Sequence, residues 1–145
     1  MAVFTSQALI DGRPMSKIPL SAEMWDMIKY KTVQGGSNII KLRGRSSFQS
    51  PAYNAVKMIE AAMGGDPFTW PSGCYVNNDS YHNVMMAMPS VIDGTGVHFT
   101  DPDGTKTEMA DLQASYEHLC AMRDEIIELG IIPPVSDWTK VNPNL

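Results

Sequence analysis

The sequence predicts an α+β fold in which a partly antiparallel sheet packs with long helices. Apolar residues recur at helical spacing over residues 51–63 and 108–129. Between these segments lie short apolar runs bounded by glycine, proline and asparagine turns, a pattern typical of antiparallel strands. The chain has 145 residues, 43% of them hydrophobic, which suits one domain, residues 1–145, with its own core.

The first segment predicts a strand at the very start of the chain. Residues 2–10 are apolar, and Asp11-Gly12 after them is a strong turn signal. Because a strand opens the sequence so abruptly, we expect that the chain begins within a longer protein.

Two helical segments are predicted next, separated by a pair of glycines. Ser21 is expected to cap a helix over residues 22–34. Gly35-Gly36 costs helix stability and predicts a break, a kink or a close backbone approach. Apolar residues at helical spacing then predict that the helix resumes over residues 37–43.

A further helix is predicted over residues 51–63. Ser50 followed by Pro51 has the pattern of an N-cap with proline at the first helical position. Gly64-Gly65 ends the segment, as glycine commonly does after a helix.

The middle of the chain predicts strands, and the end predicts a helix and a tail. Strands are expected near residues 73–76, over residues 84–92 and over residues 97–100, with Pro89 indicating an edge or a bulge. Residues 108–129 predict an amphipathic helix capped by Gly130. The remaining residues, to 145, are expected to be irregular.

Composition excludes several classes of partner. Sixteen acidic against eleven basic residues give a net charge of −5, which disfavours nucleic acid and anionic membranes as partners. No apolar run approaches the roughly 18 residues of a membrane span. Cys74 and Cys120 lack metal or redox spacing and predict reduced, packed thiols. A cytoplasmic location is expected.

Motifs for catalysis or metal binding are largely missing from the sequence. His82, His98 and His118 form no paired metal motif, so no metal site is predicted. No glycine-rich stretch has the spacing of a phosphate cradle. An unrelated small enzyme that uses His98 or Cys74 stays open as an alternative.

One segment has an unusual chemistry. Residues 41–50 place three cations and several hydroxyl groups between two predicted helices. Cations suit the C-terminal end of the first helix, and an anion suits the N-terminal end of the second. Two interpretations stay open: helix capping with solvated charges, or a binding edge for a small carboxylate.

Short motifs in this region follow an order found in one family. GGSNIIKL at residues 35–42, SSF at 46–48 and PA at 51–52 resemble the stretch GGA-x-I-x-x-L … G-S-A-Y-Y-A-P-A of the malate/lactate dehydrogenases. MPSVIDG at residues 88–94 resembles the V-P-V-x-x-G strand and turn of that family. The resemblance covers roughly residues 1–130 and is closer to the malate type.

The resemblance implies the C-terminal, substrate-binding domain of an NAD-dependent malate dehydrogenase. Met1 to Phe4 look like the segment just after the family's G-H-G-[DE] motif. The catalytic histidine and the N-terminal nucleotide-binding domain would then precede this chain. No catalytic residue, and no NAD bound to this chain by itself, is expected. In the intact enzyme a hydride would pass between C2 of malate and NAD.

The resemblance also implies the site residues of this half. Ser46 falls at a position that faces substrate and nicotinamide. Arg45 departs from the family pattern, and it either faces solvent or adds a cation beside the substrate. Ser50 falls near the nicotinamide, where the family has an apolar or small residue.

Partners follow from the same resemblance. They are a small dicarboxylate substrate, the chain's own nucleotide-binding domain and further copies of the protein. The helical residues 22–43 and the methionine-rich strand are the expected contact surfaces. A free-standing α+β binding module with the same fold and no dehydrogenase chemistry is the alternative.

Overall fold

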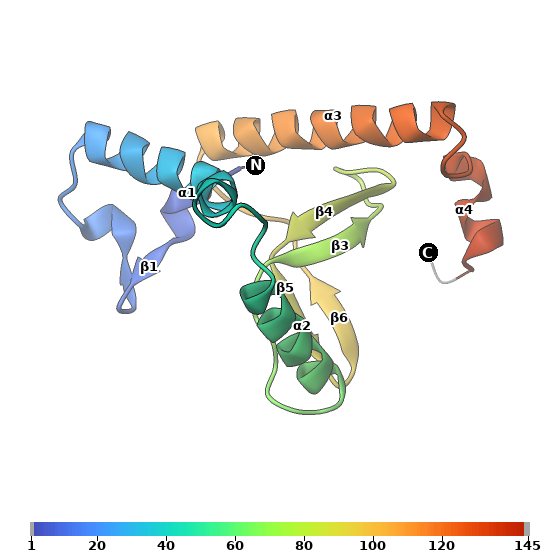
Figure 1. Cartoon of the computed structure of the whole chain (residues 1–145), viewed down its shortest axis with the longest axis horizontal. Coiled ribbons are helices and arrows are strands. Elements are labelled where there is room, and N and C mark those ends of the chain that lie inside the picture. The colour runs from blue at the N-terminus through green and yellow to red at the C-terminus, as the bar shows by residue number, and fades with distance from the viewer. Residues whose placement is uncertain (1, 144–145) are drawn as a thin grey trace.

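The computed structural model describes residues 2–143 and supports the predicted α+β class (Figure 1). Met1, at the expected junction with a preceding domain, and Asn144 and Leu145 in the expected tail lie outside the described residues. The elements in chain order are η1 Thr5–Gln7, β1 Leu9–Ile10, β2 Arg13–Pro14, η2 Met15–Lys17, α1 Ala22–Arg43, α2 Gln49–Ala62, β3 Ser72–Val76, β4 Val84–Met88, β5 Ser90–Asp93, β6 Gly96–Phe99, α3 Lys106–Glu128 and α4 Val135–Val141.

The predicted N-terminal strand over residues 2–10 is mostly wrong. Only Leu9–Ile10 forms a strand, after the short 3-10 turn η1. Polar residues in η1 hydrogen-bond to α3 in place of a β-ladder, which is how serine and threonine divert a backbone from extended structure. The Asp11-Gly12 turn is confirmed, with φ of 49° and 74° as a two-residue hairpin turn requires.

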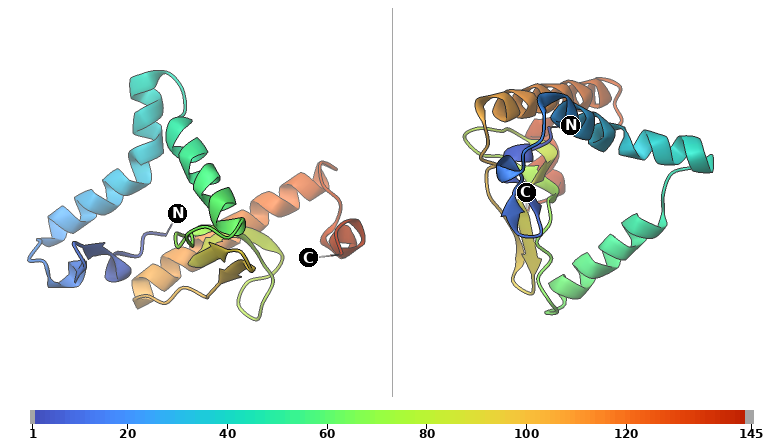
Figure 2. Two further views of the ribbon diagram at one scale, coloured as in Figure 1. Left: turned by 90° about the horizontal axis from the view of Figure 1, so that it is seen from below. Right: turned by 90° about the vertical axis from the view of Figure 1, so that its left-hand side faces the viewer.

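Helix α1 is continuous, and the predicted kink is visible in it. Ser21 caps it, accepting a hydrogen bond from the backbone N–H of Met24 at 3.3 Å. Figure 2 shows that α1 bends near its middle, and Gly35 and Gly36 both lie within this helix. A Cβ added to either glycine would meet nothing within 4 Å, so a close backbone approach is not the reason for these glycines.

Helix α2 begins earlier than predicted. Its N-cap is Phe48, and Gln49 is its first residue, so Ser50 lies inside the first turn and is not the cap. Pro51 is tolerated there because the first N–H groups of a helix have no partner within it. The helix ends before Gly64, whose φ of 91° confirms the predicted glycine stop.

The strands form three separate antiparallel pairs, β1–β2, β3–β4 and β5–β6. Pro89 divides the predicted strand over residues 84–92 into β4 and β5, as its missing N–H leads one to expect. A bridge between Phe68 and Ile92 links β5 to the segment before β3. Helix α3 packs on β4 and α2 packs on β5.

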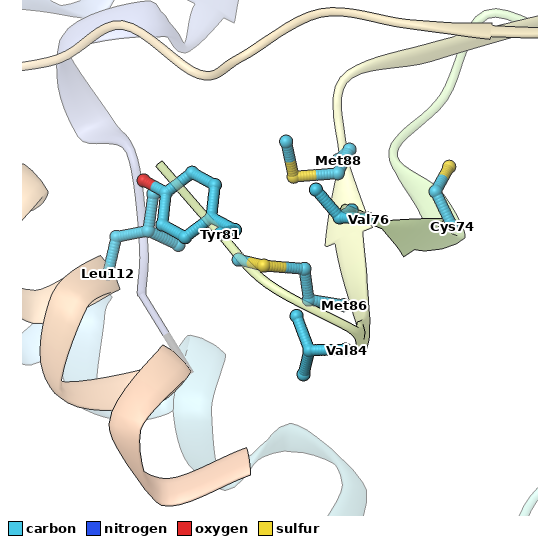
Figure 3. Packing of buried hydrophobic residues seen from close by; sticks show 7 residues of the cluster. All are labelled: Cys74, Val76, Tyr81, Val84, Met86, Met88 and Leu112. Carbon is cyan, nitrogen blue, oxygen red and sulfur yellow. The ribbon is translucent and has the colours of Figure 1, made fainter. Parts of the chain in front are cut away.

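The core lies between the β3–β4 pair and α3 (Figure 3). Burial alternates along β4, where Val84, Met86 and Met88 are buried and Met85 and Ala87 are exposed. Such alternation is expected of a strand with one covered face. The buried cluster is completed from β3, the β3–β4 turn and α3 by Cys74, Val76, Tyr81 and Leu112.

Helix α3 is confirmed, and the irregular tail is only partly correct. The helix starts at Lys106, two residues before the predicted start, because Thr105 and Glu108 form a capping box. Beyond Gly130 the tail forms the short helix α4. Trp138 anchors it, donating from Nε1 to the Pro133 carbonyl at 2.8 Å and packing on Tyr75 with ring centroids 6.1 Å apart.

Candidate functional site

The connection between α1 and α2 carries all three predicted site residues, Arg45, Ser46 and Ser50. Gly44 ends α1 in the left-handed conformation, with φ of 71°, and donates its N–H to the Ile40 carbonyl at 2.8 Å. This glycine lets the chain turn sharply out of the helix. Both views in Figure 2 place the connection at the end of the two helices that points away from the strands.

Phe48 gathers two guanidinium groups at this connection. The Cζ atom of Arg45 lies 4.8 Å from the centroid of the Phe48 ring, and that of Arg43 lies 5.6 Å from it. Both contacts are within the range of cation–π attraction. Arg43 also donates from Nη1 to Oε1 of Gln49 at 3.1 Å, which joins the last turn of α1 to the first turn of α2.

The serines supply hydroxyl groups beside these cations. Ser46 lies in the connection between the helices and Ser50 in the first turn of α2, and both are exposed. Within residues 2–143, no side-chain hydrogen bond holds Ser46, Ser47 or Ser50. The site therefore presents charged donors and free hydroxyls to solvent, a chemistry that suits an anion.

A separate cleft of about 930 Å³ lies between the N-terminal segment, β4 and α3. Its walls are mostly apolar and include Phe4, Met86, Leu112 and Leu119, with Thr32 of α1 also reaching it. None of the three predicted site residues lines it. The cleft is thus a different surface from the α1–α2 connection.

A buried carboxylate was missed by the sequence reasoning. Glu108 in α3 is 2% exposed and accepts hydrogen bonds from the Ser6 backbone and hydroxyl, at 2.9 and 2.6 Å, and from Thr105. Burial alone would raise its pKa, but these hydrogen bonds outweigh burial and lower the pKa to about 2. The Thr-x-x-Glu spacing of a capping box was the signal that could have found it.

The histidines lie apart from the predicted site residues in the chain and make contacts of their own. His98 on β6 is 2.8 Å from the Thr95 hydroxyl, which donates to or accepts from Nε2, and 3.7 Å from Asp93. The hydrogen bonds from Thr95 lower the pKa of Asp93. His82 donates its backbone N–H to the Tyr116 hydroxyl. These are turn and packing contacts.

Cysteine, metal and membrane features add no chemistry to the described residues. Cys74 and Cys120 are free thiols, and burial raises the pKa of Cys74. Within residues 2–143, no three His, Cys, Asp or Glu side chains group closely enough to hold a metal ion. None of the helices described is both long and apolar enough to pass through a membrane.

Comparison of sequences identifies similar proteins. No protein-family model matches the chain. Malate dehydrogenase of Sorangium cellulosum is 28% identical over 98 residues, which cover 67% of this chain and 31% of that protein. Malate dehydrogenase 2 of Aquifex aeolicus is 28% identical over 102 residues, with coverage of 67% and 30%. The chain therefore matches about a third of the length of these relatives.

Comparison of folds agrees with the sequences. Malate dehydrogenase of Salinibacter ruber superposes with a TM-score of 0.77 at 21% identity, covering 88% of this chain and 42% of that one. Malate dehydrogenase of Aeropyrum pernix superposes with a TM-score of 0.74 at 22% identity, covering 83% of this chain and 41% of that one. Lactate dehydrogenase of Cryptosporidium parvum superposes with a TM-score of 0.68 at 23% identity, covering 83% of this chain and 42% of that one.

The fold is that found in malate and lactate dehydrogenases, a class of oxidoreductases, of which it covers less than half. The sequence relatives narrow this class, because the homologues of the chain are malate dehydrogenases. The family resemblance predicted from the motifs is thereby confirmed.

Proposed function

We propose that this chain is the substrate-binding, C-terminal domain of an NAD-dependent malate dehydrogenase that interconverts malate and oxaloacetate. One observation carries the proposal. The similarity in sequence and fold covers most of this chain but less than half of each similar protein. Such coverage is expected if residues 1–145 are a single domain that works with a nucleotide-binding domain.

In this proposal the α1–α2 connection is one wall of the substrate pocket. Ser46 would hydrogen-bond the substrate, and the Arg45 guanidinium would pair with a substrate carboxylate. Ser50 would lie near the nicotinamide ring. The free hydroxyls of Ser46 and Ser50 and the absence of any ion pair to Arg45 among the described residues support these roles.

NAD itself would be held by the partner domain in this proposal. The residues of this chain do not fit a dinucleotide cradle, since Gly35 and Gly36 lie inside α1 and Gly94 lies in a hairpin turn. NAD would supply the hydride acceptor, and the chain described here would bind and orient the substrate. We therefore propose that the chain alone has no dehydrogenase activity.

Two surfaces support the proposed partners. The apolar cleft beside Phe4 and Leu112 is the kind of surface that another part of a longer protein covers. Helices α1 and α2 expose large apolar side chains, including Leu42 at 87%, which suits contact with a second copy of the chain. We propose a homo-oligomer on this ground. Light scattering at rising concentration tests it, and a strict monomer would argue against it.

The activity is tested by fragment complementation. The purified chain is assayed for malate-dependent reduction of NAD, alone and after mixing with Salinibacter ruber malate dehydrogenase from which the matching region has been deleted. The expected result is no turnover alone and measurable turnover in the mixture. Arg45→Met should then raise KM for malate. Turnover by the chain alone would refute the proposed inactivity.

A free-standing binding module is the second candidate. The favouring observation is that His82 bonds to Tyr116 and His98 to Thr95, and no hydrogen bond within residues 2–143 joins either histidine to Arg45 or Ser46. Under this alternative the chain binds small dicarboxylates, and no complementing fragment restores turnover. Malate binding without any turnover in the mixture would favour it over the dehydrogenase.

A cytoplasmic location completes the proposal. Two thiols remain unpaired, and the buried one is packed as an apolar group, as is usual in reducing compartments. Fractionation of the source cells tests the location, and recovery outside the cytoplasmic fraction would contradict it.

A further inference from the structure

Positive charge is concentrated around the α1–α2 connection. No aspartate or glutamate occurs between Asp26 and Glu60, although the chain as a whole carries a net charge of −5. The cations in this stretch are Lys29, Lys31, Lys41, Arg43, Arg45 and Lys57. An acidic protein thus has one region whose potential attracts anions.

Five of these six cations form no ion pair within the described residues, and three of the five lie at or next to the connection. Lys57 pairs with Glu60 at 2.7 Å, but no ion pair within residues 2–143 involves Lys41, Arg43 or Arg45. Lys41 and Arg43 lie in the last turn of α1, and Arg45 follows its cap, Gly44. The guanidinium groups of Arg43 and Arg45 both contact the Phe48 ring, so their charges act on the same small volume. That volume is available to an anion from solvent.

Cation–π contact with Phe48 holds the two guanidinium groups near one ring, and a ring accepts no conventional hydrogen bond from them. Arg45 makes no hydrogen bond within the described chain and keeps all its donors, and Arg43 gives one to Gln49. The Cζ atoms of Arg43 and Arg45 lie 5.6 and 4.8 Å from the centroid of the same Phe48 ring. These two distances together set an upper limit on the separation of the two guanidinium charges.

The surroundings add uncharged donors. The first turn of α2 has no side-chain cap, so its backbone N–H groups and the positive end of its dipole are available beside Phe48. The hydroxyls of Ser46, Ser47 and Ser50 are also unbonded within the part of the chain described. Guanidinium, hydroxyl and amide donors therefore occur together within residues 43–50.

We infer that Phe48 is a positioning residue that holds Arg43 and Arg45 as a two-guanidinium site for one doubly charged anion with carboxylate or phosphate oxygens. The inference deepens the proposed function and rests on it for the link to malate, because it adds Phe48 and Arg43 to the wall already assigned to Arg45 and Ser46. The ring acts through the arginines and does not itself touch the anion.

The side-chain Nε–Hε signals of arginine in NMR spectra test this site directly. The chain has only four arginines, of which Arg13 on β2 and Arg123 on α3 serve as internal references. The full chain is titrated separately with L-malate, inorganic phosphate and acetate. Saturable shifts of Arg43 and Arg45 with a dianion, weaker shifts with acetate and none at the references are expected. Parallel shifts of all four would overturn the inference as general screening.

Variants separate the ring from the charges. Phe48→Leu should weaken dianion binding about threefold and move the Arg43 and Arg45 signals in the free protein, because the contact of each with the ring is lost. Phe48→Tyr keeps a ring and should restore both. Arg45→Met should weaken binding about fivefold, whereas Arg13→Met should leave it unchanged. Circular dichroism checks that each variant is folded. Unchanged affinity in Phe48→Leu would overturn the inference.

The outcomes distinguish this inference from the proposed function. Dianion binding by the chain, with no turnover in the complemented mixture, supports the site and rejects the dehydrogenase. Turnover in the mixture with KM and kcat unaffected by Phe48→Leu supports the dehydrogenase and rejects the site. Binding of phosphate without malate supports a two-guanidinium anion site and rejects its link to the substrate.

Discussion

Ser6 and Glu108 stand 102 residues apart in sequence, yet the Ser6 hydroxyl donates to Oε2 of Glu108 at 2.6 Å. The same carboxylate accepts from the Ser6 backbone N–H and from Thr5 and Thr105. No cation is paired with it within the described residues, so hydrogen bonds alone stabilise this buried charge. It ties the N-terminal segment to the start of α3, beside the apolar cleft.

Glu108→Gln should therefore destabilise the fold. The amide is neutral, and its NH2 group would face the donors of Ser6 and Thr105. The expected loss in free energy of unfolding is about 2 kcal/mol, as for other buried groups left with mismatched donors. Urea denaturation measures it. Glu125→Gln on the exposed face of α3 is the matched control and should change stability by less than about 0.5 kcal/mol.

Glu108 should also make stability depend on pH. Its pKa is about 2 in the folded chain against an ordinary 4.5, so its contribution is present above pH 4.5 and is lost as the pH falls from 4.5 through about 2. The urea midpoint of the wild type should fall over this window more steeply than that of Glu108→Gln. Parallel curves for the two proteins would show that another group is responsible.

Replacing a glycine by alanine should change the stability of the chain in opposite directions in α1 and just before α3. Gly35→Ala should stabilise the chain by up to about 1 kcal/mol, because it lies in a helix and an added Cβ meets nothing within 4 Å. Gly104→Ala should destabilise it, since the Cβ would come within 2.7 Å of the Phe4 ring. Thermal unfolding compares the two. A less stable Gly35→Ala would indicate that the bend itself is needed for packing.

Two methionines of β4 provide a matched pair for the core. Met88 is fully buried and Met85 is 60% exposed, although both lie on the same strand. Met88→Ala should cost about 2–5 kcal/mol through lost burial and a residual cavity. Met85→Ala should cost less than about 1 kcal/mol in the isolated chain. Denaturant midpoints measure the difference, and equal losses would contradict the alternation of burial along β4.

Local patterns in the sequence predicted the elements whose causes are local. Helix α3 follows from the helical spacing of its apolar residues. The division of the predicted strand at Pro89 follows from the missing backbone N–H of proline. Elements decided by distant contacts were predicted poorly. The strand over residues 2–10 is lost to bonds with Glu108, and α4 forms where Trp138 packs on Tyr75.

The candidate site likewise has a part that the sequence motifs predicted and a part that only the structure revealed. The motifs indicated the connection between α1 and α2 and the residues Arg45, Ser46 and Ser50. They did not reveal the role of Phe48, because a ring gathers two guanidinium groups only once the chain has turned at Gly44.

The sequence by itself determined the α+β class, the order of the elements from α1 to α3 and the likeness to malate dehydrogenases, since all three depend on residue types at fixed spacing. Only the tertiary structure decided which groups meet. It separated the apolar cleft from the basic connection, buried Glu108 among donors from distant residues and set Arg43 and Arg45 over one ring. Those contacts depend on how the chain folds back on itself, which local spacing does not specify.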